Sequence, residues 1–129
     1  MSMKSTLKVG STIMLLLTGA GCVGGARIIQ SGNNEVELLR GAHHNLGVTD
    51  VTFNSDGLVR SAQVKIRNLE FSNLVVAYYF IWFDQWGEQV GVVDRINKTL
   101  TIPGEGMQII RHNAPYPSCT SFKLFIELQ

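Results

Sequence analysis

Apolar and polar positions alternate clearly in the second half of the chain. Between Ser61 and Arg67 the apolar residues Ala62, Val64 and Ile66 fall on every second position, and residues 122–128 repeat this period. A period of two is typical of half-buried β-strands. The run Leu74–Phe83 is rich in β-branched and aromatic residues, which favours a strand over a helix.

Turn residues separate these runs at 54–57 and at 103–106. About seven short strands are predicted after residue 45, and no helical pattern of three turns occurs there. The pattern therefore predicts an all-β domain over residues 46–129, an antiparallel β-sandwich of the immunoglobulin or fibronectin kind.

The first 21 residues have the pattern of a cleaved signal peptide. Lys4 and Lys8 supply a positive start, Ile13–Leu17 supplies an apolar stretch, and small residues follow. The apolar stretch is too short for a transmembrane helix, which needs about 20 residues.

The residues Ala20, Gly21 and Cys22 resemble the lipobox of bacterial lipoproteins, although Gly19 stands where a Leu-like residue is usual. The resemblance implies cleavage before Cys22 and attachment of acyl chains, such as palmitate, to it. Val23 in place of Asp further implies anchoring in the outer membrane of a Gram-negative bacterium, with the domain facing the periplasm. The alternative is an ordinary signal peptide followed by an unmodified cysteine.

Residues 22–45 are interpreted as the lipidated cysteine and a flexible tether. Gly24, Gly25 and the polar run Ser31–Asn34 interrupt any periodicity. Within this segment, Glu35–Arg40 is compatible with one strand or with a helical turn.

The run Leu74–Phe83 is unusual because both of its faces are apolar, whereas the outer face of a sandwich strand is normally polar. We assign one face to the core: Val76, Tyr78, Phe80 and Trp82. The other face forms an apolar stripe: Val75, Ala77, Tyr79, Ile81 and Phe83. Either Ile28–Leu39 or Glu88–Val93 covers this stripe, or the stripe docks a protein partner or a second copy. The candidate contact residues are Tyr79, Ile81, Phe83 and the nearby Trp86.

Composition narrows the possible functions. The chain has 129 residues, 45% of them hydrophobic, and a formal net charge of +1. This charge provides no basic surface for nucleic acid. Two cysteines cannot build a disulfide scaffold. With Cys22 acylated, Cys119 is either a buried small residue or a free thiol.

Candidate catalytic or metal-binding residues are sparse. His43 and His44 are adjacent, and on a strand they would point to opposite faces, where one metal ion could not bind both. No activated nucleophile, carboxylate pair or phosphate-binding loop is evident. The sequence therefore predicts a protein that is not an enzyme and has no cofactor and no metal. A small-ligand or metal carrier that uses His112 and Cys119 is an alternative.

Three segments together are similar to the YcfL-like family of small bacterial envelope lipoproteins, which share a domain of unknown function. They are Tyr78–Asp84 with Gly87, Thr101–Pro103, and Phe122–Leu128. The resemblance implies a β-sandwich lipoprotein without established enzymatic activity. Genes of this family often lie near a lipoprotein that activates a peptidoglycan synthase. We therefore expect a protein-interaction module of the cell envelope, with an accessory role in peptidoglycan synthesis as the alternative.

Overall fold

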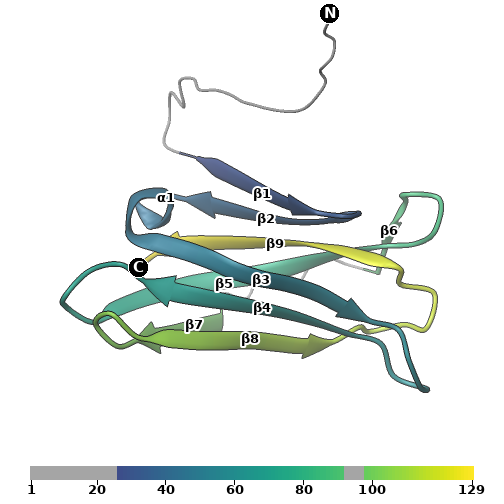
Figure 1. The fold of residues 1–129 in the computed structure, drawn as a ribbon. Coiled ribbons are helices and arrows are strands. Elements are labelled where there is room, and N and C mark those ends of the chain that lie inside the picture. Colours follow the sequence, from purple (N-terminus) through teal and green to yellow (C-terminus); the bar gives the residue numbers. More distant parts are fainter. Residues whose placement is uncertain (1–25, 92–97) are drawn as a thin grey trace, which may run out of the picture.

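The computed structural model describes residues 26–91 and 98–129, which form two β-sheets (Figure 1). The larger sheet has six strands in the order β1-β2-β9-β5-β6, with β7 also paired to β5, and the smaller sheet has the order β3-β4-β8. The elements are β1 Arg27–Ser31, β2 Asn34–Leu39, α1 Ala42–Asn45, β3 Leu46–Asn54, β4 Ser61–Asn68, β5 Leu74–Phe83, β6 Gln89–Val90, β7 Lys98–Ile102, β8 Met107–Asn113 and β9 Ser121–Leu128.

The two sheets pack face to face around one hydrophobic core. The larger sheet contributes residues from β2, β9 and β5, and the smaller sheet contributes residues from β4 and β8. Aromatic rings join the two layers: the ring of Phe53 lies 6.3 Å from that of Phe122 and 6.5 Å from that of Trp82, centroid to centroid. The predicted all-β sandwich is therefore confirmed.

Alternation predicts which side chains of the strands enter the core. On β4 the residues Ala62, Val64 and Ile66 are fully buried, while the residues between them are partly exposed. On β9 the same holds for Leu124 and Ile126. The period of two in the sequence thus corresponds to two real faces.

The predicted flexible tether is wrong for its described part. Residues 27–45 form β1, β2 and α1, and Val36, Leu38 and Ala42 are completely buried. β2 pairs in parallel with β9, so the sandwich is not purely antiparallel. The polar Gly-Asn pair between β1 and β2 is a hairpin turn, in which Gly32 adopts a positive φ of 61°.

The predicted signal peptide, the lipobox and Cys22 lie outside the described residues. Among the residues that the structure describes, no helix is long and apolar enough to cross a membrane.

Candidate functional site

The outer face of β5 is the face predicted to bind a partner. The core assignment is confirmed, because Val76 and Trp82 are buried and Tyr78 and Phe80 pack against the core. On the opposite face Val75 is 43% exposed. On the same face, Ala77 is buried, and Tyr79, Ile81 and Phe83 are partly buried.

The described parts of the two segments expected to cover this face, residues 28–39 and 88–91, do not lie over it. Ile28–Leu39 belongs to β1 and β2, which extend the same sheet beyond β9. In the Glu88–Val93 segment, Gln89 and Val90 pair with the end of β5, and residues 92 and 93 lie outside the described part. The described parts of both segments therefore belong to the same sheet as β5. They make that sheet wider and do not form a layer over its outer face.

The centre of this outer face is an aromatic pair. Tyr79 lies opposite Phe125 in the β5–β9 ladder, and the two rings stack with centroids 4.9 Å apart at an angle of 13°. Beside them is a cavity of about 50 Å³, lined by Leu39, Ala77, Tyr79, Phe125, Ile126 and Glu127. Such a volume is far below the roughly 300 Å³ of a typical small-molecule pocket.

Charged side chains border the aromatic pair. The Lys123 Nζ atom lies 3.4 Å from the carboxylate of Glu35, and the Arg40 Nε atom lies 3.5 Å from that of Glu127. Glu37, aligned with Phe125 in the β2–β9 ladder, has no ion pair among the described residues. This face thus combines apolar side chains with one unpaired acidic group, which would favour a partner carrying a basic side chain.

Trp86 lies away from this aromatic pair, in the turn after β5. The carboxylate of Asp84 accepts hydrogen bonds from the backbone N–H groups of Trp86 (2.9 Å) and Glu88 (3.0 Å), and these bonds stabilise the turn. The Trp86 side chain is 77% exposed. Phe83 lines an adjacent hollow of about 330 Å³. The four predicted contact residues therefore fall into two places, Tyr79 and Ile81 on the sheet face and Phe83 and Trp86 near its end.

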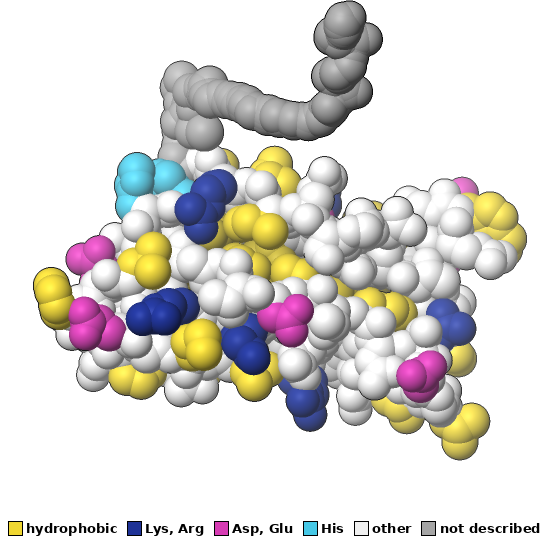
Figure 2. All heavy atoms as spheres, viewed as in Figure 1, with side chains coloured by type: hydrophobic (Ala, Val, Ile, Leu, Met, Phe, Trp, Pro, Cys, Tyr) yellow, Lys and Arg dark blue, Asp and Glu magenta, His cyan; other side chains and the backbone are white. Residues whose placement is uncertain are grey.

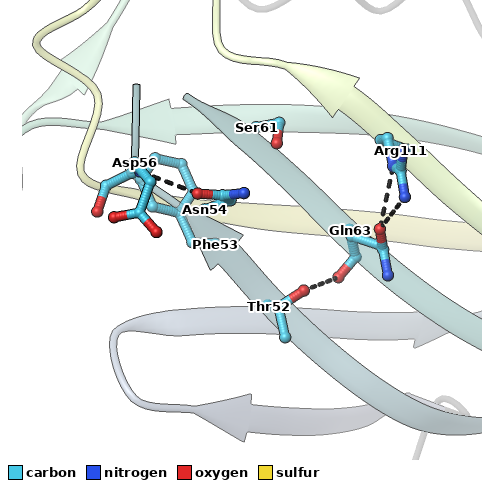
Figure 3. Close-up of a pocket in the computed structure, with 8 residues that line it drawn as sticks. Thr52, Phe53, Asn54, Asp56, Ser61, Gln63 and Arg111 are labelled. Atoms are coloured by element: carbon cyan, nitrogen blue, oxygen red, sulfur yellow. Dashed lines mark hydrogen bonds between the residues drawn. The ribbon is translucent and has the colours of Figure 1, made fainter. Parts of the chain in front are cut away.

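A polar hollow on the smaller sheet was not predicted. Its volume is about 470 Å³, and it lies over the outer face of β3, β4 and β8 (Figure 3). Arg111 donates hydrogen bonds from Nε and Nη2 to the Oε1 atom of Gln63, and Asn54 holds the backbone of Asp56 at the hairpin tip. Strand alternation alone marks the polar outer positions of β3 and β4. Only the β4–β8 pairing brings Arg111 beside Gln63.

This polar hollow is exposed to solvent. Arg111, Asn54 and Asp56 are all exposed, so water screens their charges and dipoles. Basic, acidic and hydrophobic side chains are interspersed on this side of the molecule (Figure 2). We therefore assign no ligand to the hollow.

His112 and Cys119, the residues of the predicted carrier, have different surroundings. His112 contacts the rings of Tyr78 and Phe80, and its Nε2 atom lies 3.3 Å from the Tyr78 hydroxyl. Burial and the charge of Lys98 lower the pKa of His112, and burial raises the pKa of Tyr78. Cys119 is a fully buried free cysteine in the core, as its first interpretation predicted.

His43 and His44 lie in the short helix α1 and not on a strand, so the expected opposite orientation is wrong. Their ring centroids are 3.8 Å apart. Burial, His44 and Arg27 lower the pKa of His43. Within the described part of the chain no group of three or more His, Cys, Asp or Glu side chains is placed to hold a metal ion.

Comparison with known proteins supports the fold. A crystal structure of a DUF1425 family member from Shewanella sp. pv-4 shares 18% identity at a TM-score of 0.56, covering 80% of this chain and 88% of that one. The crystal structure of Campylobacter jejuni cj0090 shares 22% identity at a TM-score of 0.51, covering 64% and 85%. No curated protein matches the chain.

The family assignment comes from the sequence. Residues 35–128 match the family described as protein of unknown function (DUF1425). The match begins inside β2, in agreement with the folded state of residues that had been expected to form a tether. The narrower YcfL-like resemblance stays an expectation. The chain belongs to the DUF1425 family.

Proposed function

We propose that this protein is a non-catalytic lipoprotein, anchored in the outer membrane through acyl chains on Cys22, that docks an envelope protein in the periplasm. The docking surface is the outer face of β5 together with Phe125 and Leu39. The observation that carries the proposal is the apolar outer face around the Tyr79–Phe125 stack, which no part of residues 27–39 or 89–90 overlies.

The anchor is supported by the charged start, the short apolar stretch and the small residues before Cys22. Each buried acyl CH₂ group contributes about 0.8 kcal/mol, so several chains would hold the protein stably in a leaflet. A protein held in this way needs only modest intrinsic affinity for a partner in the same compartment, because tethering raises the local concentration.

Docking is supported by the chemistry of the face. Aromatic and aliphatic side chains with a small cavity are typical of interface cores, whereas paired charges are typical of their rims. Glu37 adds a preference for a basic group opposite it. A strand inside a sheet also holds these side chains in a rigid arrangement, which lowers the entropic cost of binding.

In-cell photo-crosslinking tests the docking surface. A photoreactive amino acid at position 81 of the lipidated protein is expected to give one dominant protein adduct, identified by mass spectrometry. The matched control is position 52, because Thr52 is exposed on the outer face of the other sheet. Equal adducts from both positions, or none from position 81 in a folded protein, would contradict the proposal. A peptidoglycan-synthesis protein as the adduct would identify the narrower role.

Metabolic labelling with a palmitate analogue tests the anchor. We expect label in the unsubstituted protein and none in Cys22→Ala, which should leave the membrane fraction. Label that persists in Cys22→Ala would contradict acylation at this residue. Cys119→Ala is the control, since its thiol is buried in the core.

A further inference from the structure

The two ends of the sandwich differ in their distance along the structure from Arg27, where the chain coming from Cys22 enters the domain. One end, here called the anchor end, comprises α1, the loop 69–73, the turn 103–106 and the C-terminus (Figure 1). The opposite end, here called the far end, comprises the β3–β4 hairpin, the turn after β5 and the loop before β9. The strand registers place these loops together, since Leu46 pairs with Asn68 and Leu74 pairs with Ile102.

The chain enters the domain on the side of the anchor end. Arg27 begins β1 and pairs with Leu38, near the end of β2. Its Nη2 atom donates a 2.8 Å hydrogen bond to the carbonyl of Leu46, and the carbonyl of the preceding residue, Asn45, accepts a 2.9 Å bond from the N–H of Leu69. The entry strand is thus bonded to the start of β3, and the residue just before β3 is bonded to the loop 69–73.

A membrane anchor at Cys22 would hold this end close to lipid. Four residues lie between Cys22 and Arg27, and the five residue-to-residue steps span at most about 18 Å when fully extended. The domain therefore could not stand far from the leaflet that receives the acyl chains, and its anchor end would be the nearest part.

The loop 69–73 exposes two large apolar side chains. Phe71 is 91% exposed and Leu69 is 53% exposed. Acidic residues Glu70 and Glu105 are also in this part of the molecule, and hydrophobic and acidic side chains lie together at the left end of Figure 2. Large apolar side chains at an exposed tip match the boundary between acyl chains and headgroups, whereas the two carboxylates are repelled by anionic headgroups and add no attraction.

The backbone of this loop is held by the protein itself. Asn68 is fully buried; its Nδ2 atom donates to the carbonyls of Ser72, Ile102 and Pro103, and its Oδ1 atom accepts from the N–H of Glu70. The loop also packs tightly against the next turn, because a Cβ atom on Gly104 would lie 1.9 Å from the Phe71 carbonyl oxygen.

These bonds matter for contact with lipid, where unsatisfied backbone groups are costly. Backbone groups of the loop form hydrogen bonds with Asn68 and Glu105 of the domain, while the Phe71 side chain is exposed. Because the loop is fixed, the exposure of Phe71 is a property of the folded domain.

We propose that the anchor end rests on the phospholipid leaflet that holds the acyl chains, with Phe71 inserted between the headgroups and Leu69 beside it. This inference rests on the proposed acylation of Cys22. It gives the domain a fixed orientation, in which Trp86 and the β3–β4 hairpin are directed away from the membrane.

The test uses the full lipidated protein in vesicles of phosphatidylethanolamine and phosphatidylglycerol. An environment-sensitive dye is attached to Phe71→Cys or, as the matched control, to Leu58→Cys, since Leu58 is 99% exposed at the far end. The unsubstituted protein is treated with the same dye, and this control measures how much dye reacts with the buried Cys119. We expect the dye at position 71 to shift its emission to the blue and to be quenched by nitroxide-bearing lipids, and the dye at position 58 to show neither effect.

Equal quenching at both positions, or stronger quenching at position 58, would overturn the inference. A blue shift at position 71 without quenching by lipid would also overturn it and would indicate a protein contact, such as a second copy. Flotation of the vesicles separates this failure from failure of the anchor. A protein that floats with vesicles but shows no quenching at position 71 retains the proposed anchor and loses only the orientation, whereas a protein that does not float loses both.

Discussion

Asn68 is the polar residue on which the anchor end depends. Burying an amide is costly unless its hydrogen bonds are satisfied, and here the side chain bonds to two loops at once. Nothing in its sequence position, at the end of an alternating strand, distinguishes it from an ordinary turn asparagine.

We expect Asn68→Ala to lower the free energy of unfolding by about 3 kcal/mol, because it leaves several carbonyls and one N–H without their partner. Urea denaturation measures this change. Asn113→Ala, at an exposed position at the end of β8, is the control and should change stability by less than about 0.5 kcal/mol. Similar losses in the two variants would show that the buried network contributes little.

His112 makes stability depend on pH. Its pKa is lowered in the folded state, chiefly by burial, so the unfolded chain binds the proton more readily. The stabilisation is present above the ordinary histidine pKa and is lost as the pH falls through the lowered value. His43, whose pKa is also lowered, acts in the same direction.

We therefore expect the free energy of unfolding to decrease between pH 7.5 and pH 5, as measured by chemical denaturation at each pH. In His112→Gln this decrease should be smaller. An unchanged pH dependence in that variant would mean that other groups cause it.

At the scale of elements, β5 shows how far alternation predicts structure. The assignment of its core face from the sequence is confirmed, because bulky aromatic residues on one set of positions fill the space between two sheets. The partners of the other face could not be predicted, since they depend on which strand lies beside β5. The ladder with β9 puts Phe125 beside Tyr79 and Lys123 beside Ile81.

Two adjacent valines on β5 test the two faces. Val76 is fully buried, whereas Val75 is 43% exposed. We expect Val76→Ala to cost about 2 kcal/mol of stability through the cavity it leaves. Val75→Ala should cost less than about 1 kcal/mol, mainly through lower strand propensity. Thermal or urea unfolding of both variants measures the difference, and equal costs would contradict the assignment of the faces.

At the scale of the whole molecule, the boundary of the folded domain is the main correction to the sequence interpretation. β2 lies between β1 and β9 inside the larger sheet, and the side chain of Asn34 accepts a 3.1 Å hydrogen bond from the N–H of Phe122, 88 positions later. Removing β2 would leave one edge of β9 unpaired and would expose the core side chains that pack against Val36 and Leu38.

We expect a chain beginning at Leu46, the boundary predicted from the sequence, to fail to fold, and a chain beginning at residue 26 to fold cooperatively. Circular dichroism and the dispersion of amide resonances distinguish these outcomes. A folded chain from Leu46 onward would show that β1 and β2 are only an accessory to the sandwich.

The sequence by itself determined the local features of this protein. A period of two marks β4 and β9, turn residues mark their ends, and the apolar faces of β5 follow from residue type, because these signals depend on neighbours along the chain. The tertiary structure decided the rest. It set the parallel pairing of β2 with β9 and the Tyr79–Phe125 stack. It also placed Phe71 at the end of the domain where the chain enters. Each of these features depends on residues far apart in the sequence. Their contacts are set by which strands lie side by side, and no local pattern encodes that order.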